Sequence, residues 1–433
     1  MSETPRLRIA IVGAGIAGLT AAIALKIHPG IDVQIYERAT KLQEIGASIA
    51  LGPNGLRTLD RLGLDNAIDD SIAFRNLKTK LPMIYRHYKT NEVVSADHHK
   101  GQVIDRHLTS RYYRAHLQQA LLEHIDPAQL HLGKAFLSIL YSSSPKELTI
   151  KFLDGSTTTA DLLLGADGIN SAVRRFFVPS SQPQWTGWVT FRSVFPFSHV
   201  SDIPDLPDEA THFWGHERTL FVSKLGKDLF TVVGSYQSDP DAADAPYKDA
   251  VWDSDGDVSV LRKYYKDWSP LIRAIVDAVP HTRIYPNVAA QGLDSWTLGA
   301  GRVTLAGDAA HAHGGAFAAG GSLAIDDGWS FAQSVLNVFP PSATKLPGDE
   351  DIAKSLRVYG RTRKPHTDQV LYTVHSGNKA KVERIGKVET DEELRARMKN
   401  RGDPTWIHEH DVVAALRDAV AAEEKPLGIE ARL

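Results

Sequence analysis

Three short segments contain the residues whose types and spacing could do chemistry. They are Gly13-Ala14-Gly15-Ile16-Ala17-Gly18, Gly165-Ala166-Asp167-Gly168 and Gly307-Asp308-Ala309-Ala310-His311. Each follows an apolar run typical of a buried strand, and each supplies backbone N–H groups or a carboxylate at the end of that strand. Groups of this kind hold the ribose and phosphate oxygens of a dinucleotide. Together the three segments predict FAD.

The first segment matches the fingerprint of a dinucleotide-binding fold. A strand predicted at Leu7–Val12 runs into Gly13, Gly15 and Gly18, and an Ala-rich helix follows at Leu19–Leu25. The glycines permit a tight turn, so the pyrophosphate would bind the free N–H groups at the start of the helix. The alternative is a turn with a purely structural role.

A carboxylate follows the fingerprint at the distance that a nucleotide requires. A second strand, Asp32–Tyr36, ends in Glu37, about 20 residues beyond the glycines. A carboxylate there accepts hydrogen bonds from both ribose hydroxyls and repels a 2′-phosphate, which favours FAD or NAD over NADP. We expect the nucleotide to bind Gly13, Gly15, Ala17, Gly18 and Glu37.

The second and third segments favour a flavin. In the second, Asp167 is expected to order the turn and to approach the ribityl or pyrophosphate region, with Arg174 as a nearby cation. In the third, Asp308 is expected to accept a hydrogen bond from a ribityl hydroxyl. An Asp-Gly pair alone is a common turn. It is the occurrence of both segments downstream of an intact fingerprint that favours FAD.

Composition excludes several classes of protein. The 433 residues carry a net charge of −3 and are 42% hydrophobic, which is typical of a globular protein and makes nucleic acid an improbable partner. The chain has no cysteine, so its electron carrier must be an organic cofactor. We expect no metal, because His311 and His313 lack further ligands nearby.

No apolar run reaches the roughly 20 residues that span a bilayer, so we expect neither a signal peptide nor a membrane segment. The predicted location is cytoplasmic. The last residues, Ala431-Arg432-Leu433, resemble a variant of the Ser-Lys-Leu peroxisomal signal, which leaves peroxisomal import open.

The pattern of elements predicts an α/β fold in which two domains interleave and a helical segment ends the chain. A Rossmann-like FAD-binding domain takes up residues 1–76, 103–184 and 291–345. A mixed β-sheet substrate domain takes up an excursion at 77–102 and the aromatic-rich strands of 185–290, and residues 346–433 form the C-terminal helical region. Within these parts we expect a hairpin of Leu148–Leu153 with Thr159–Leu164, and one helix over Leu261–Ala278.

Candidate substrate-binding residues lie in the predicted strands of the second domain. Alternation along Gly187–Phe197 places Trp188, Thr190 and Arg192 on one face. An inward Arg192 would be an unpaired buried charge unless it met a carboxylate or a phenolate; an outward, solvated Arg192 is the alternative. His212 and Tyr236, on neighbouring strands, are the other candidates, with ordinary core packing as their alternative role.

The chain resembles the single-component FAD-dependent aromatic hydroxylases, which are group A flavoprotein monooxygenases. The resemblance is strongest to their salicylate-hydroxylase-like branch. The resemblance covers nearly the whole chain. Besides the three segments, it rests on Glu37-Arg38-Ala39, Ile45-Gly46-Ala47-Ser48-Ile49, Gly52-Pro53-Asn54-Gly55, Arg114-Ala115-His116-Leu117 and Trp406-Ile407-His408-Glu409-His410-Asp411. It implies further FAD contacts at Arg38, Ala50, Arg114, Gly320, Gly321 and Ser322. The chain departs from the family pattern at two positions. His116 replaces an acidic residue, and Gly315 replaces a proline that is expected beside the flavin ring.

The resemblance implies an FAD-dependent monooxygenase that consumes NADH or NADPH and O₂. It would hydroxylate a small, salicylate-like phenolic substrate through a flavin C4a-hydroperoxide, with or without decarboxylation at the ortho or ipso carbon. Arg192, Tyr236 and His212 are the candidate catalytic residues. The single fingerprint agrees with a nicotinamide donor that binds transiently. We expect a monomer or a homodimer.

Other functions remain open on the same scaffold. One is a flavin monooxygenase of a secondary-metabolite pathway that carries out oxidative dearomatisation or epoxidation. A halogenase or a reductase is another, although the chain has no Trp-x-Trp-x-Ile-Pro segment. A non-catalytic flavin-binding or sensor protein is the third.

Overall fold

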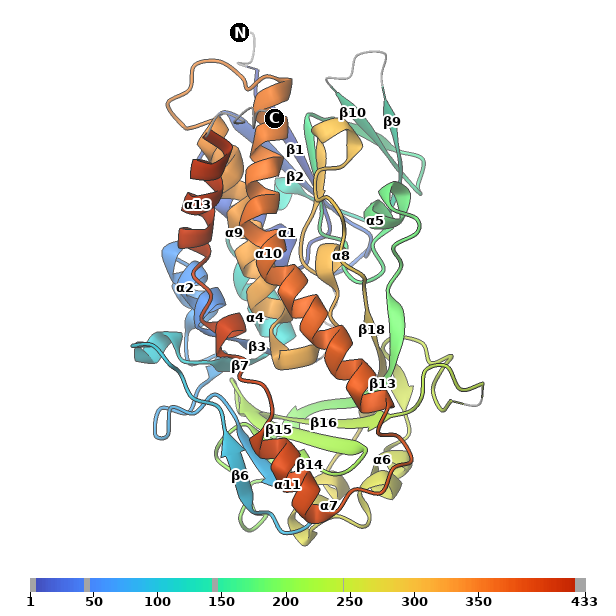
Figure 1. Ribbon diagram of the computed structural model, residues 1–433. Coiled ribbons are helices and arrows are strands. Elements are labelled where there is room, and N and C mark those ends of the chain that lie inside the picture. Colours follow the sequence, from blue (N-terminus) through green and yellow to red (C-terminus); the bar gives the residue numbers. More distant parts are fainter. Residues whose placement is uncertain (1–4, 43–46, 142–146, 244, 425–433) are drawn as a thin grey trace, which may run out of the picture.

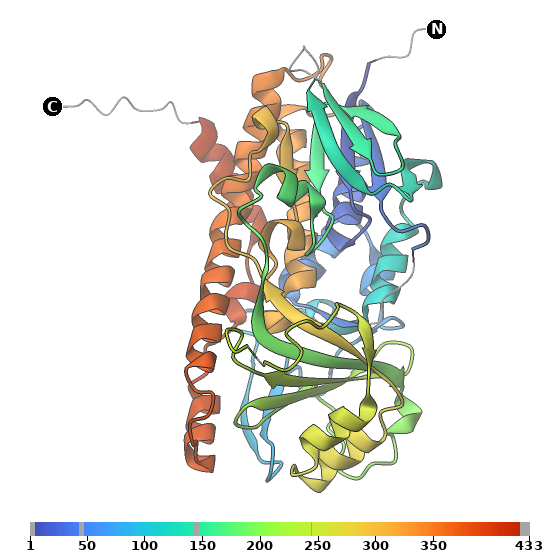
Figure 2. The same ribbon diagram turned by 90° about the vertical axis from the view of Figure 1, so that its right-hand side faces the viewer.

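The computed structural model describes residues 5–42, 47–141, 147–243 and 245–424. Two β-sheet layers lie one above the other in Figure 1, and the long helix α10 (Asp349–Val382) extends along both. Figure 2 shows the same helix along one side of the molecule. The strands and helices of the lower layer lie beside its C-terminal end. The residues of the Ala431-Arg432-Leu433 signal and of Ile45-Gly46 lie outside the described ranges.

The first sheet is parallel and gathers strands from distant parts of the chain. Its order is β19-β12-β1-β2-β8. These strands span Leu7–Val12 (β1), Ile31–Glu37 (β2), Leu130–Leu132 (β8), Leu162–Gly165 (β12) and Val303–Leu305 (β19). Because parallel strands end at the same edge, the three chemical segments meet there. The helices α1 (Ile16–Leu25) and α9 (Gly320–Val338) pack together; every residue of α1 is buried.

The predicted hairpin is wrong at its second strand. β10 (Leu148–Phe152) pairs antiparallel with β11 (Thr157–Ala160) and with β9 (Phe136–Tyr141). The chain then leaves the hairpin at Asp161, and Leu162–Gly165 joins the parallel sheet as β12. A run of consecutive buried leucines suits a strand that is covered on both faces, which the hairpin does not offer.

The second sheet has the order β17-β18-β13-β16-β15-β14-β5-β6. Its strands span Ile84–His87 (β5), Val93–Ala96 (β6), Gln184–Pro196 (β13), Thr211–Trp214 (β14), Arg218–Leu225 (β15), Leu229–Gln237 (β16), Ser254–Gly256 (β17) and Thr282–Ala289 (β18). β5 pairs parallel with β14, so the 77–102 excursion adds the last two strands to this sheet. The α/β fold class with a mixed second sheet is confirmed.

One face of the second sheet is covered by two helices where the sequence predicts one. α6 (Val258–Tyr265) and α7 (Pro270–Asp277) are separated at Ser269, whose hydroxyl accepts a hydrogen bond from the N–H of Ile272. Pro270 fits the first turn of a new helix but would break a continuous one. An apolar core of valine, phenylalanine and tyrosine side chains fills the space between these helices and the sheet.

The remaining elements connect the two layers. A small antiparallel sheet has the order β3 (Ser48–Leu51), β7 (Ser110–Tyr113), β4 (Ala73–Phe74). The other helices are α2 (Pro53–Arg61), α3 (Asp65–Ile68), α4 (Arg114–Leu122), α5 (Ala172–Phe177), α8 (Asp308–His311), α11 (Asp391–Lys399), α12 (Thr405–His408) and α13 (Val412–Glu424). Over the described residues, no helix combines the length and the apolar character that crossing a membrane requires.

Candidate active site

The glycines of the first segment have two different physical roles. Gly13 has a φ of +112°, and a Cβ atom there would lie 2.3 Å from the carbonyl oxygen of Ala166. A Cβ atom on Gly18 would lie 2.1 Å from the carbonyl oxygen of Gly13. Both glycines are therefore required by the protein itself: Gly13 brings the turns after β1 and β12 into contact, and Gly18 lets α1 pack closely against the turn that precedes it.

Gly15 is different, because a Cβ atom there would meet only one protein atom, 4.0 Å away. Gly15 precedes the first residue of α1, and no side chain caps that helix. The first N–H groups of α1 thus lack a side-chain acceptor at the positive end of the helix. A pyrophosphate fits this arrangement, since it supplies the acceptor and the negative charge that the protein does not.

The carboxylate of Glu37 lies against the same loop. One of its oxygens accepts a hydrogen bond from the N–H of Ala14 at 2.9 Å, and the other accepts one from the N–H of Ala39, also at 2.9 Å. Each oxygen keeps a further lone pair with which it can accept from a ribose hydroxyl. Arg38 follows with an exposed side chain. This set of groups fits the adenosine end of FAD.

The resemblance implies further FAD contacts, and the structure gives these residues different positions relative to this loop. Arg114 begins α4, which Gln118 ties to the fingerprint by donating to the carbonyl of Ala14 at 2.8 Å. Ala50 is buried in β3. Ala17 is buried too, and a Cβ atom on Gly307 would lie 3.3 Å from its methyl group. Ala17 therefore lets the first and third segments pack closely.

Asp167 orders its own turn. Its carboxylate accepts from the hydroxyl of Ser171 at 2.5 Å and from the N–H groups of Ala172 at 2.7 Å and Val173 at 3.1 Å, all at the start of α5. Burial raises the pKa of Asp167, against the opposing effect of these hydrogen bonds. The side chain is thus engaged within the second segment, and a direct contact with FAD remains a prediction.

Arg174 has a larger role than the sequence indicated, because it joins the second and third segments. Its guanidinium donates to the carbonyls of Ala309 at 3.1 Å, Ala310 at 2.7 Å and Gln291 at 2.7 Å, and also to Ser181. The side chain is 2% exposed, and burial lowers its pKa to about 10. It therefore stays charged at neutral pH while holding three loops together.

A buried network of charged side chains, centred on α9, supports the third segment. Asp327 on α9 accepts from the N–H of Gly307 at 2.8 Å, lies 2.6 Å from Nε2 of His311, and accepts from Nε of Arg363 at 2.8 Å. Burial opposes the charge on Asp327, yet the pairing with His311 and Arg363 lowers its pKa. Sequence reasoning missed Asp327, although the acidic pair Asp326-Asp327 inside an apolar helix is a visible signal.

This network leaves Asp308 as the exposed carboxylate of the third segment. It is the first residue of α8, and its charge acts on Arg192 and on His313. Because Asp308 lies at the sheet edge and faces these cationic or titratable groups, it is available to a ribityl hydroxyl. Among the described residues, no group of three or more His, Asp or Glu side chains has the arrangement of a metal site.

The glycine-rich loop before α9 is partly structural. The hydroxyl of Ser322 accepts from the N–H of Gly52 at 2.9 Å, and a Cβ atom on Gly321 would lie 2.8 Å from Ile49. These residues therefore dock α9 onto β3. A Cβ atom on Gly320 would have only His313 as a close neighbour, at 3.1 Å.

Gly315 explains one departure from the family pattern. It has a φ of +72°, a conformation closed to the proline that the pattern carries there. A Cβ atom on Gly315 would lie 3.2 Å from Nη2 of Arg192. Glycine at this position therefore gives the arginine room.

Arg192 lies on the inward face of the second sheet. Its Nε donates to the hydroxyl of Thr190 at 3.2 Å, and its Cζ lies 5.1 Å from the ring centroid of Tyr285. Burial lowers the pKa of Arg192, an effect that Tyr285 and the charge of Asp308 partly oppose, and no carboxylate in the described part of the chain lies within ion-pair distance of it. Arg192 is half-buried, and a cation that is partly withdrawn from water is stabilised by an anion. The outward, solvated position is not what the structure shows.

His212 lies on the same face as Arg192. It pairs with Phe221 across β14 and β15, and its ring contacts that of Tyr85. Burial lowers its pKa to about 3, and the nearby charges of Lys381 and Arg401 add to this effect. His212 is therefore neutral at physiological pH and too weakly basic to take a proton there.

Tyr236 is not brought into the site. It pairs with Val189, and therefore lies on the face of the sheet opposite to Arg192. Its ring stacks on Tyr264 of α6 at 4.8 Å and 4°. The sequence shows alternation along each strand, but it does not show how β16 is aligned with β13. We therefore withdraw Tyr236 as a catalytic candidate.

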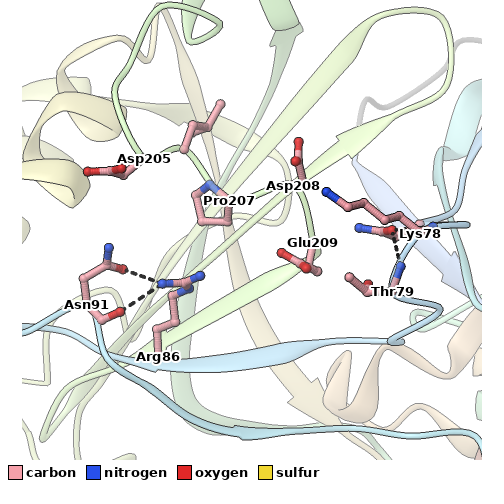
Figure 3. A pocket seen from close by; sticks show the side chains of 10 residues that line it. Lys78, Thr79, Arg86, Asn91, Asp205, Pro207, Asp208 and Glu209 are labelled. Atoms are coloured by element: carbon pink, nitrogen blue, oxygen red, sulfur yellow. Dashed lines mark hydrogen bonds between the residues drawn. The ribbon is translucent and has the colours of Figure 1, made fainter.

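A polar cavity of about 330 Å³ lies elsewhere, between β5 and the loop that precedes β14 (Figure 3). Arg86 points into it and donates to the backbone carbonyl of Asn91 at 3.0 Å. None of the predicted site residues lines this cavity. We therefore assign it no part in the chemistry.

The fold and this set of groups define a flavoprotein. Residues 6–216 match the model of a family described as an FAD binding domain. The chain is 30% identical over 329 residues to the 3-amino-4-hydroxybenzoate 2-monooxygenase of Streptomyces cremeus, covering 74% of this chain and 76% of that one. It is 26% identical to the 6-hydroxynicotinate 3-monooxygenase of Pseudomonas fluorescens, covering 95% and 96%.

A solved structure agrees in fold. The structure described as a salicylate hydroxylase substrate complex matches 99% of this chain and 100% of its own with a TM-score of 0.79, at 23% identity. The chain belongs to the FAD-dependent aromatic monooxygenases of the salicylate-hydroxylase type. It is an FAD-dependent monooxygenase, and its cofactor is FAD.

Proposed function

We propose that this enzyme hydroxylates a small phenolic substrate with electrons from NADH or NADPH and with oxygen from O₂. The observation that supports this most directly is Arg192, an inward cation without a carboxylate partner in the described chain, located between Thr190 and Gly315. The names of the relatives above, which include a hydroxynicotinate and a hydroxybenzoate, point to ring substrates with an oxygen substituent and a carboxylate.

Bound FAD would pass two electrons from the nicotinamide to O₂, of which one oxygen atom would enter the ring and the other would leave as water. The residues of the chain contribute binding and electrostatics. Arg192 stabilises the phenolate oxygen, which makes the ring carbons beside it more nucleophilic. His212 takes no proton in this proposal, since its pKa of about 3 leaves it neutral, and the phenolic proton is released to bulk solvent.

The loop that carries Gly315 lies beside Arg192 and leaves room for the guanidinium. In this proposal, Glu37 and the N–H groups of α1 bind the adenylate end, while Asp308 binds the ribityl chain. With a carboxylate on the attacked carbon, the carbon–carbon bond breaks and CO₂ leaves to give a catechol. Without one, a hydrogen on that carbon is lost as a proton.

The test uses the yellow, FAD-loaded enzyme with NADH or NADPH and a panel of phenols, with oxygen uptake and product mass as readouts. We expect uptake that the substrate stimulates, together with a product that has gained oxygen. Release of CO₂ from a carboxylated phenol distinguishes decarboxylative from simple hydroxylation. Hydrogen peroxide as the sole product with every phenol would contradict the proposal.

A further inference from the structure

Lys381 lies at the end of α10 that reaches the second sheet. Figure 1 shows that end beside β13, and Nζ of Lys381 is 5.0 Å from the ring centroid of Trp188 on that strand. Trp188 shares a face with Arg192, four positions further along β13. No ion pair joins Lys381 to a carboxylate within the described ranges, and the charged groups that act on it are Arg384 and Arg397.

The side chains beside Lys381 present hydrogen-bond donors. Gln237 pairs with Trp188 across β16 and β13 and is 6% exposed. The side-chain nitrogens of both residues, Nε2 of Gln237 and Nε1 of Trp188, are buried and have no acceptor in the described protein. Buried donors without an acceptor are destabilising. This corner of the sheet therefore offers a cation and two N–H donors, and it lacks a group that accepts from them.

The spacing along β13 suits one aromatic ring. Four strand residues cover about 13 Å, and the side chain of Arg192 leans into that interval. Arg192 leans back toward Thr190, to which its Nε donates, while Lys381 lies over Trp188. The two cations are thus placed at opposite ends of an interval that one ring can bridge when its two oxygen substituents are para to each other.

We propose that Lys381, with Gln237 and Trp188, binds a carboxylate of the aromatic substrate whose phenolic oxygen Arg192 holds. This inference rests on the proposed function of the site. It makes Lys381 a specificity-determining residue that selects hydroxy-aromatic acids over neutral phenols. Burial lowers the pKa of Lys381 to about 8, with Arg384 and Arg397 adding to the effect, as expected for a cation that lacks its counter-ion.

The alternative is that the lysine only packs its aliphatic stem against Trp188. Lys381→Met keeps that packing and removes the charge, and Lys381→Arg keeps a charge. Lys379, which is exposed on the same helical turn, provides the matched control as Lys379→Met. The probes are 4-hydroxybenzoate and 4-hydroxyphenylacetate, each compared with its neutral amide.

Binding to the FAD-loaded enzyme is measured by calorimetry, and KM and kcat are measured in parallel. We expect Lys381→Met to weaken both carboxylates at least about tenfold, which is about 1.4 kcal/mol, and to change the amides less than twofold. Lys381→Arg should retain most of the preference, and Lys379→Met should match the wild type. Equal losses for acids and amides, or no loss for either, would overturn the assignment.

The two proposals fail separately. If the wild type binds carboxylates more tightly than amides yet forms no oxygenated product, the assignment of Lys381 stands and the proposed hydroxylation fails. If neutral phenols are hydroxylated as well as their acids, and bind equally, the function stands and the role of Lys381 fails.

Discussion

At the edge of the first sheet, the groups that we propose to bind the ligand are backbone N–H groups and carboxylates that follow directly after strands. On the second sheet they are long cationic side chains that come from β13 and from the end of α10. The first arrangement is local in sequence, since Gly15 and Glu37 belong to one β-α-β unit. The second depends on strand register and on helix packing. Cofactor binding is therefore built from the backbone, and substrate selection from a few side chains.

The strongest test of this comparison separates two glycines of one loop. Gly13→Ala should lower the free energy of unfolding by about 3 kcal/mol or more, because a positive φ and a 2.3 Å contact oppose the new methyl group. Gly15→Ala meets no close protein atom, so it should fold normally and lose FAD affinity instead. Thermal unfolding of the FAD-free proteins and the flavin-to-protein absorbance ratio measure the two effects. Equal stability losses would contradict the division.

The second prediction concerns the cation of the substrate side. Arg192→Met should lower kcat/KM for phenols about 100-fold, as the loss of one charge-stabilising donor does in other enzymes. FAD content and NAD(P)H oxidation without substrate should not change. Arg192→Lys should recover part of the rate. A parallel fall in all three quantities would show that Arg192 has only a structural role.

The third prediction concerns the carboxylate of the cofactor side. Glu37→Gln should weaken FAD binding by about 1–3 kcal/mol, because the amide loses acceptor capacity toward the N–H groups of Ala14 and Ala39 and toward the ribose. The FAD dissociation constant measures the effect by titration of the apoenzyme. The kcat at saturating FAD should stay close to that of the wild type; a large fall in kcat would assign Glu37 a different role.

The smallest expected effect is a pH dependence. Lys381, whose pKa is lowered to about 8, is charged below that value and loses its proton as the pH rises through it. The affinity for carboxylated phenols should therefore be highest below about pH 8 and fall severalfold above it. The neighbouring Arg384 and Arg397 keep their charges, and His212, with a pKa of about 3, stays neutral. Lys381→Arg should flatten the profile measured by calorimetry; an unchanged profile would exclude Lys381 as its source.

Much of the first sheet could be predicted from the sequence, because short runs of neighbouring residues specify its strands and turns. The fingerprint, Glu37 and the strand Val303–Leu305 are each read from fewer than about ten residues. Predictions that needed a distant partner failed or were incomplete. The hairpin partner of β10 ended earlier than predicted, and Pro270 began a new helix. The first error comes from a strand whose end depends on what covers it. The second overlooked a local signal, since Ser269 and Pro270 mark the start of a new helix.

The candidate substrate residues show the same limit more sharply. Alternation along β13 grouped Arg192 with Trp188 and Thr190, since one strand determines its own faces. The alternation did not show which face of β13 looks toward the interior. It also did not show how β16 is aligned with β13, and this alignment places Tyr236 beside α6. Lys381 is about 190 positions from Arg192 in the chain and carries no local motif, so only the course of α10 brings it to this sheet.

The amino-acid sequence by itself determined the class of fold, the cofactor and the loops that hold it, because tight turns and strand-end carboxylates are encoded by neighbouring residues. The tertiary structure decided which cations face the substrate, which aspartate supports the third segment and which tyrosine lies on the opposite face. Those outcomes depend on register and burial, which set the surroundings of a charge and hence its need for a partner. No local pattern of residues contains that information.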